Sequence, residues 1–279
     1  MKKVLLTTTA LTLLAGAAAA EMGVSGDGRV GVNSTGGTTT VDYRYRVYFK
    51  GSGETDGGLT FGAKTGIRLD DPAAVTGIFG ASLWVSNGTM TLRVGNTGGA
   101  VASTSGIWSV PTVGYTGMSF GGQLWTGISS STTTGAGPNN VALDFTLGSA
   151  NVTLSQTIAG NTEFAANFKL GSATIGIGYD NGTTAATGGT VVTAAFDAGS
   201  ANIAVAYRMP AAGGTAEWAL GASTAMGAGS LKGYASNRGA TNNYGIGYGA
   251  SLGGGASWAV GFQSIAGVTR VEAGLNFGF

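Results

Sequence analysis

The charged residues of this chain are spaced as fixed charges that attract or repel ions, and not as a catalytic group. Asp42, Arg44 and Arg46 occupy alternate positions of one segment, and Lys64 follows the same pattern in the next segment. The 279 residues include no His and no Cys, so the common catalytic triads and the usual zinc ligands are missing. No paired-carboxylate, phosphate-loop or dinucleotide-binding signature stands out. We therefore expect neither an enzyme nor a cofactor or metal site.

Two neighbouring segments must position these charges. Apolar and charged residues alternate over residues 41–50, and the pattern repeats over residues 59–70 after the turn GSGETDGG. Successive side chains of a strand point to opposite faces, so the segments predict an antiparallel hairpin with one apolar and one cationic side. A soluble sandwich would explain one such hairpin. The alternation continues to the C-terminus, however, and Tyr43, Tyr45 and Phe49 lie on the apolar side, which favours a barrel with lipid outside and water inside.

The composition agrees with a membrane barrel. Only 10% of the residues are charged, whereas ordinary soluble domains carry roughly 25%. No window reaches the ~18 consecutive apolar residues that a membrane helix needs, so a membrane location requires closed strands in which every backbone group is paired. The formal net charge of +1 offers no basic surface for nucleic acid.

The N-terminus has the features of a secretory signal peptide. Lys2 and Lys3 precede an apolar run, and Ala18-x-Ala20 supplies a small-residue cleavage site. We expect cleavage after Ala20, so that residues 1–20 are the signal peptide. Residues 21–279 would then form a single barrel domain, exported to the outer membrane.

Short tight turns alternate with longer polar loops along the chain, as in outer-membrane barrels. Counting the alternating segments, one of them at 120–128, predicts an all-β, antiparallel, up-and-down transmembrane barrel of 18 strands. A barrel of 16 strands is the alternative, because the segment at 229–237 is weak. The alternation stops over residues 95–112, which read GNTGGAVASTSGIWSVPT and are longer than most connections in compact proteins.

Four segments carry a resemblance to a known family. They are EMGVSGDGRVGV (21–32), RYRVYFKGSGETDGGLTFGAK (44–64), LWVSNGTMTLRVGN (83–96) and the terminal NFGF. Together they resemble the general bacterial porins, in particular those of alphaproteobacteria. The resemblance implies a homotrimeric diffusion porin, integral to the outer membrane among lipid and lipopolysaccharide, that passes small hydrophilic solutes and ions.

The resemblance also implies a third loop that folds into the lumen and faces a basic wall, so that the two form a constriction. The loop would be 95–112. The resemblance places Arg29, Arg44, Arg46 and Lys64 in the basic wall. By their positions in this sequence we add Arg93, Asp42 and Trp108 to the constriction, with Trp108 as an anchor of the loop against the wall. The loop carries no carboxylate, unlike the family's usual third loop, so we expect neither a strong transverse field nor an acidic calcium site. These charges could instead only line a wide lumen.

The predicted function is a water-filled diffusion channel that weakly prefers anions. A substrate-specific sugar channel is one alternative, with Tyr48, Trp84 and Trp125 as scattered inward aromatics. A non-conducting structural barrel is another, but it would need a lumen packed with side chains, whereas many Gly and Thr at inward positions favour open space. A loop inside the lumen should be shielded from external protease.

Overall fold

The computed structural model describes residues 20–71, 77–117, 130, 132, 135–158, 160–184, 188–238 and 241–279. Apart from Ala20, the predicted signal peptide lies outside these residues, as do the predicted strand at 120–128 and Trp125. The strands are β1 (Glu21–Thr35), β2 (Thr38–Glu54), β3 (Thr60–Asp71), β4 (Gly77–Ile78), β5 (Ser82–Ser86), β6 (Met90–Gly95), β7 (Asn140–Leu147), β8 (Ala150–Gln156), β9 (Thr162–Leu170), β10 (Ala173–Asp180), β11 (Gly189–Asp197), β12 (Ala201–Pro210), β13 (Glu217–Met226), β14 (Gly229–Ser236), β15 (Asn243–Gly253), β16 (Ala256–Ile265) and β17 (Val268–Gly278). Two short 3-10 helices, η1 (Val101–Ser103) and η2 (Ser105–Trp108), follow β6. Within the described residues, no helix is long and apolar enough to cross a membrane.

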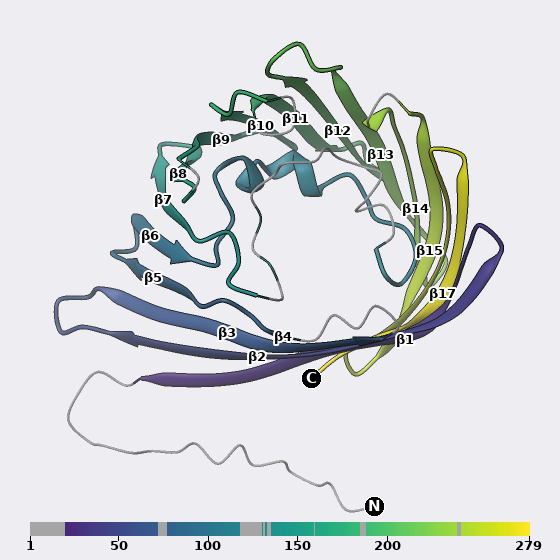
Figure 1. Cartoon of the computed structure of the whole chain (residues 1–279), viewed down its shortest axis with the longest axis horizontal. Helices are drawn as coiled ribbons and strands as arrows, with labels where there is room; N and C mark the ends of the chain where they lie inside the picture. Colours follow the sequence, from purple (N-terminus) through teal and green to yellow (C-terminus); the bar gives the residue numbers. More distant parts are fainter. Residues whose placement is uncertain are drawn as a thin grey trace, which may run out of the picture.

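The strands form one closed antiparallel barrel (Figure 1). β1 pairs with both β2 and β17, and the other strands pair with their sequence neighbours, except that β4 and β5 both pair with β3, so the described strands form a closed ring. β4 and β5 both pair with β3, through residues 67–68 and 60–64 respectively. They are therefore two parts of one barrel strand, and the seventeen elements of the described chain make sixteen barrel strands. The all-β fold class is confirmed.

The count of 18 strands is wrong, and the alternative of 16 is correct. β6 pairs directly with β7, from Met90 opposite Phe145 to Gly95 opposite Asn140. β6 and β7 are therefore neighbours in the barrel, whereas a strand at 120–128, which lies outside the described residues, had been counted between them. Alternation is a local property of the sequence, and it does not reveal which segments become neighbours in a sheet.

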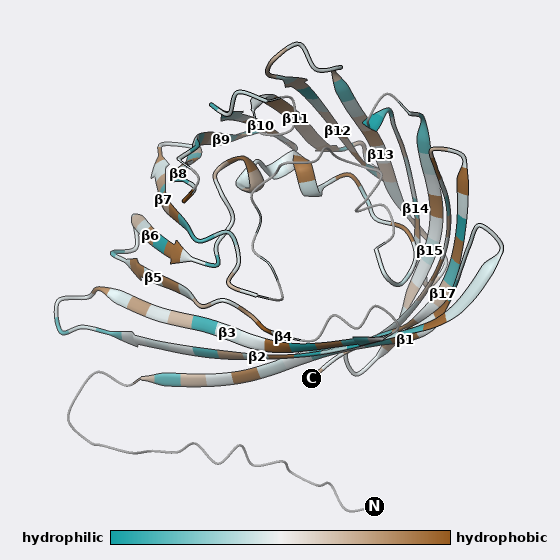
Figure 2. Cartoon of the chain, viewed as in Figure 1, coloured by the Kyte–Doolittle hydropathy of each residue, from teal (hydrophilic) through white to brown (hydrophobic). Residues whose placement is uncertain are grey.

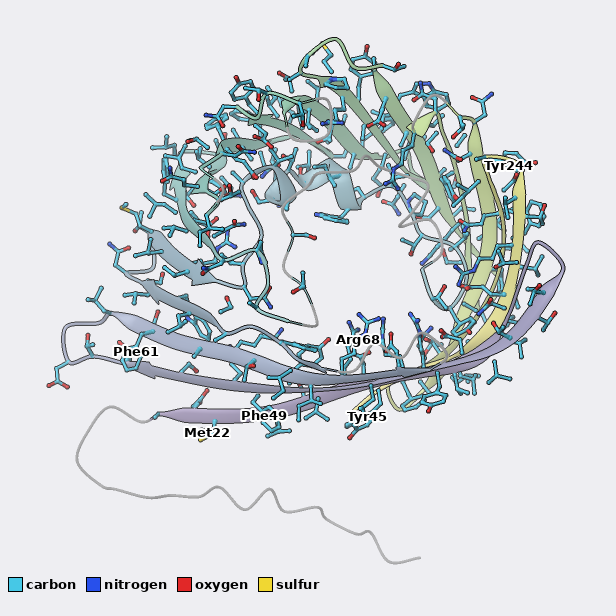
Figure 3. The ribbon with its side chains drawn as sticks, in the orientation of Figure 1. Met22, Tyr45, Phe49, Phe61, Arg68 and Tyr244 are labelled. Atoms are coloured by element: carbon cyan, nitrogen blue, oxygen red, sulfur yellow. The ribbon has the colours of Figure 1, made fainter. Side chains whose placement is uncertain are left out.

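The two faces of the wall follow the period-two pattern. Tyr45 and Phe49 of β2 and Phe61 of β3 point away from the barrel interior, whereas Arg68 of β3 points into it (Figure 3). Hydrophobic and hydrophilic residues accordingly alternate along these strands (Figure 2). Large apolar side chains are exposed on the outward faces of nearly all the strands, as a wall in lipid requires.

The C-terminal residue completes the barrel. Gly26 N donates to Phe279 O at 2.8 Å, and Phe279 N donates to Gly26 O at 3.1 Å. The Phe279 ring stacks on Tyr45 with ring centroids 5.6 Å apart. The last residue therefore joins the two ends of the chain by its backbone and packs against β2 by its ring.

Deletion of Phe279 is expected to lower the yield of folded barrel in the outer membrane. The deletion removes two backbone hydrogen bonds at the junction, and each unsatisfied backbone group in lipid costs several kcal/mol. The measurement is the fraction of heat-modifiable, folded protein in outer-membrane preparations. Phe279→Tyr keeps both backbone bonds and the stacked ring and is the control. An undiminished yield of the deletion variant would contradict the expectation.

Candidate pore constriction

After β6 the chain turns into the barrel, and residues 96–117 follow its inner wall (Figure 1). η1 lies against β9 and β10, and η2 lies against β10, β11 and β12. Backbone groups of the loop bond to inward side chains of the wall. Ser105 N donates to Asn167 Oδ1 at 2.7 Å, and Gly106 N donates to Thr193 Oγ1 at 3.2 Å. The predicted inward-folded third loop is confirmed.

Glycines of the wall lie beneath this loop. A Cβ atom at Gly178 would lie 2.6 Å from Thr104 Oγ1, and one at Gly221 would overlap Pro111. Such distances are far below van der Waals contact, so a larger residue at either position would push the loop off the wall. The prediction that inward glycines mark open space is wrong at these positions, because the loop fills it.

Two buried carboxylates hold the loop at its two ends. Glu163 is 2% exposed, and its Oε2 accepts a hydrogen bond from Val101 N at 2.9 Å. Glu272 is 1% exposed, and its carboxylate accepts bonds from the backbone N and the hydroxyl of Thr116. The sequence analysis missed both residues. Only their inward position in the alternation could have indicated them, and that signal is shared by many residues.

Tyr115 extends the loop to the junction of the first and last strands. Its ring covers Gly31 of β1 and Gly274 of β17, which face each other in the register. Its hydroxyl donates to Asp42 Oδ1 at 3.4 Å. Burial, with the carboxylates of Asp42 and Glu272 nearby, raises the pKa of the Tyr115 phenol to about 12. Tyr115 is therefore a neutral hydrogen-bond donor at neutral pH.

A cluster of arginines occupies β1–β3, across the ring from η2 (Figures 1 and 3). Arg29 pairs with Asp42 at 2.9 Å, whereas Arg44 and Arg46 share Asp27, at 3.3 and 2.8 Å. The structure thus brings together four of the predicted residues: Arg29, Arg44, Arg46 and Asp42.

Arg68 and Asp70 also belong to this arginine cluster. They form an ion pair on β3, and Arg68 lies opposite Arg46 in the register. The sequence analysis left them out of the candidate site, although the alternation that placed Lys64 inward applies equally to both. Four arginines face three aspartates in the cluster, so one positive charge is left over. Arg44 carries part of this positive charge, because it shares the Asp27 carboxylate with Arg46. Its buried Nε also has no hydrogen-bond partner among the described residues.

The comparisons with known proteins agree on one family. The sequence matches the Gram-negative porin family over residues 7–276. The chain belongs to that family. A porin of Fuscovulum blasticum is 38% identical over 85 residues, a stretch that spans 30% of this chain and 29% of the relative. Solved structures of engineered mutants of Rhodopseudomonas blastica porin share the fold. One has a TM-score of 0.81 at 23% identity, and another has 0.79 at 24%; both alignments cover 93% of this chain and 100% of the other.

As a member of this family with a β-barrel fold, the chain is an integral outer-membrane protein. Of the three remaining predicted residues of this porin, Lys64 adjoins the arginine cluster, because Arg46 lies over the same Tyr48 ring with its Cζ 5.6 Å from the centroid. Arg93 and Trp108 have other partners. Arg93 on β6 pairs with Asp144, with Nη2 2.8 Å from Oδ1, and also bonds to Thr97 at the start of the loop. The Lys64 ammonium lies 4.6 Å from the centroid of the Tyr48 ring. Among the described residues, no group of three or more acidic side chains lies together as a metal site would require.

Trp108 lies partly on the exposed side of the loop of the porin. The side chain is 45% exposed, and its Nε1 donates to Ala102 O within the loop at 2.6 Å. Ile107 and Val110, each 0% exposed, pack in the buried cluster under the loop. Adjacent residues of a short helix face different ways, and Ile107 takes the wall side. The anchoring role of Trp108 stays a prediction.

Ile107→Ala is expected to destabilise the folded porin far more than Trp108→Ala. Truncating a fully buried isoleucine costs about 2–5 kcal/mol, whereas the Trp108 side chain is 45% exposed and buries a smaller share of its surface. The measurement is the temperature at which each variant loses its folded electrophoretic mobility. Equal losses in the two variants would contradict this assignment of the anchor.

Proposed function

We propose that this porin forms a water-filled channel through which small hydrophilic solutes and ions diffuse passively, with a weak preference for anions. One observation carries the proposal: a positively charged arginine cluster faces a loop without carboxylates across the interior of a closed barrel. The membership of the porin family and the barrel fold indicate a channel and not an enzyme.

The charges around the loop support the preference for anions. Glu163 and Glu272 lie behind the loop, bonded to its amides, so they add little negative charge to the water-filled space. Fixed charge at a narrow point sets ion preference, and charges more than the Debye length of ~8 Å away are screened at physiological salt. The constriction in this proposal consists of Arg29, Asp42, Arg44, Arg46, Arg68, Arg93 and Trp108, and Lys64 lies at its edge toward the short turns.

The rest of the proposal concerns maturation and assembly. Cleavage after Ala20 leaves Glu21 as the first residue, and residues 21–279 form the barrel domain. The mature porin assembles as a homotrimer, and its apolar outer face contacts lipid and lipopolysaccharide. The family supports the trimer, and the exposed apolar side chains support the contact with lipid.

Single-channel recording in a planar bilayer tests this proposal. Purified porin should insert with stepwise conductance that closes in three equal substeps, and the reversal potential in a salt gradient should show a weak preference for chloride over potassium. Absence of conductance would contradict the proposed channel function. Saturable block by a neutral sugar would favour the substrate-specific alternative.

A further inference from the structure

The lumenal face of β2 and β3 carries like charges in directly opposed pairs. Arg46 lies opposite Arg68, and Lys50 lies opposite Lys64. Like charges directly opposite each other destabilise an antiparallel pair of strands. Aspartates compensate the arginine pair. The lysine pair has no such compensation, since neither lysine forms an ion pair within the described residues.

Aromatic rings hold the two ammonium groups in place. Lys64 Nζ lies 4.6 Å from the centroid of the Tyr48 ring, and Lys50 Nζ lies 5.5 Å from that of Trp84. A cation over an aromatic face is attracted by the ring quadrupole, and its charge is not neutralised. Both lysines thus keep their full charge at defined positions on an exposed part of the lumenal face.

Glycines and a phenylalanine support the two rings. The Trp84 ring lies over Gly62 of β3, where any Cβ would overlap it. Tyr48 meets Phe79 edge to face at 5.5 Å, and Phe79 covers Gly66, where a Cβ would lie 2.9 Å from its ring. The local packing therefore fixes the ring under each lysine.

The lysine pair adjoins the arginine cluster along the strands. Lys50 is four residues from Arg46 on β2, which corresponds to about 13 Å of extended chain. Lys64 lies closer, because its ammonium and the Arg46 guanidinium lie over the same Tyr48 ring, with Arg46 Cζ 5.6 Å from the ring centroid. The pair therefore extends the positive charge of the cluster along the lumenal face. The pair lies toward the end of the barrel that holds the short turns and the chain termini.

We propose that Lys50 and Lys64 form a second anion-binding station, which small oxyanions of the phosphate class occupy between the constriction and the periplasmic mouth. This rests on the proposed channel function. A lysine ammonium binds phosphate as a point charge with three donors. The station lies in contact with water, so it binds weakly and releases its ligand, as conduction requires.

The test is block of chloride current by inorganic phosphate in a planar bilayer. Phosphate should reduce the wild-type chloride current saturably. The variant Lys50→Gln with Lys64→Gln should need about tenfold more phosphate for the same reduction, since two charge-assisted contacts are lost. Trp84→Leu keeps both charges but frees Lys50, and it should weaken the block by a smaller factor. Lys232→Gln, a single lysine on the lumenal side of β14, is the matched control and should leave the block unchanged.

The outcomes separate this inference from the channel proposal. A wild type that conducts ions but is not blocked by phosphate would contradict the Lys50–Lys64 site. It would not contradict the proposed channel function. Equal block in the wild type and the double variant, or equal weakening in the Lys232 variant, would also contradict the Lys50–Lys64 site. A wild type without conductance would contradict the channel itself.

Discussion

Replacing both Glu163 and Glu272 by alanine is expected to release the loop from the wall. Each substitution leaves a backbone N–H of the loop, at Val101 or Thr116, without its acceptor. An unsatisfied buried donor costs about 1–3 kcal/mol, and every 1.4 kcal/mol corresponds to a tenfold change in an equilibrium. The population of detached loop should therefore rise by at least one order of magnitude.

A single engineered thiol can measure this release. The chain contains no cysteine, and Thr104, a loop residue that is 0% exposed on the side facing the wall, is close in size to cysteine. In a Thr104→Cys background, the thiol should react with an impermeant maleimide faster in the double alanine variant than in the parent. Glu163→Gln keeps an oxygen acceptor for Val101 N and should react at nearly the parental rate. Equal rates in all three proteins would show that the carboxylates do not hold the loop.

Replacing Arg44 and Arg46 by serine is expected to change the preference of the pore from anions to cations. Both arginines share Asp27, so the double substitution removes two positive charges and leaves that carboxylate unpaired. Loss of two long side chains should also raise the single-channel conductance. The measurement is the reversal potential across a salt gradient.

Two controls separate charge from shape in that experiment. Arg46→Ser with Asp27→Ser removes one charge of each sign and should keep the anion preference. Arg238→Ser, between β14 and β15, should do little because external charges are screened. A cation-selective wild type, or an unchanged reversal potential in the double arginine variant, would show that the arginines only line a wide lumen.

The sequence predicts which side chains face outward and which face inward, because this depends only on the local alternation of apolar and polar residues. The outward faces of Tyr45 and Phe49 and the inward faces of Arg44 and Arg46 follow from period two, and Arg68 could have been assigned in the same way. The strand number and the loop contacts depend on long-range pairing. Nothing within β6 indicates that it joins β7, and nothing near Glu163 indicates that a distant amide binds it.

The position of Tyr115 has a consequence for the order of folding. The first half of the loop binds β9–β11, which lie 62 to 87 residues away in the sequence, whereas Glu272 lies 156 residues from Thr116. Its second half binds Glu272 and lies over Gly31 and Gly274, which come together only when the two ends of the chain meet. Contacts between distant segments form late, because loop closure costs entropy first. The lumen should therefore acquire its final shape in two stages, and burial of Tyr115 marks the moment at which the wall becomes complete.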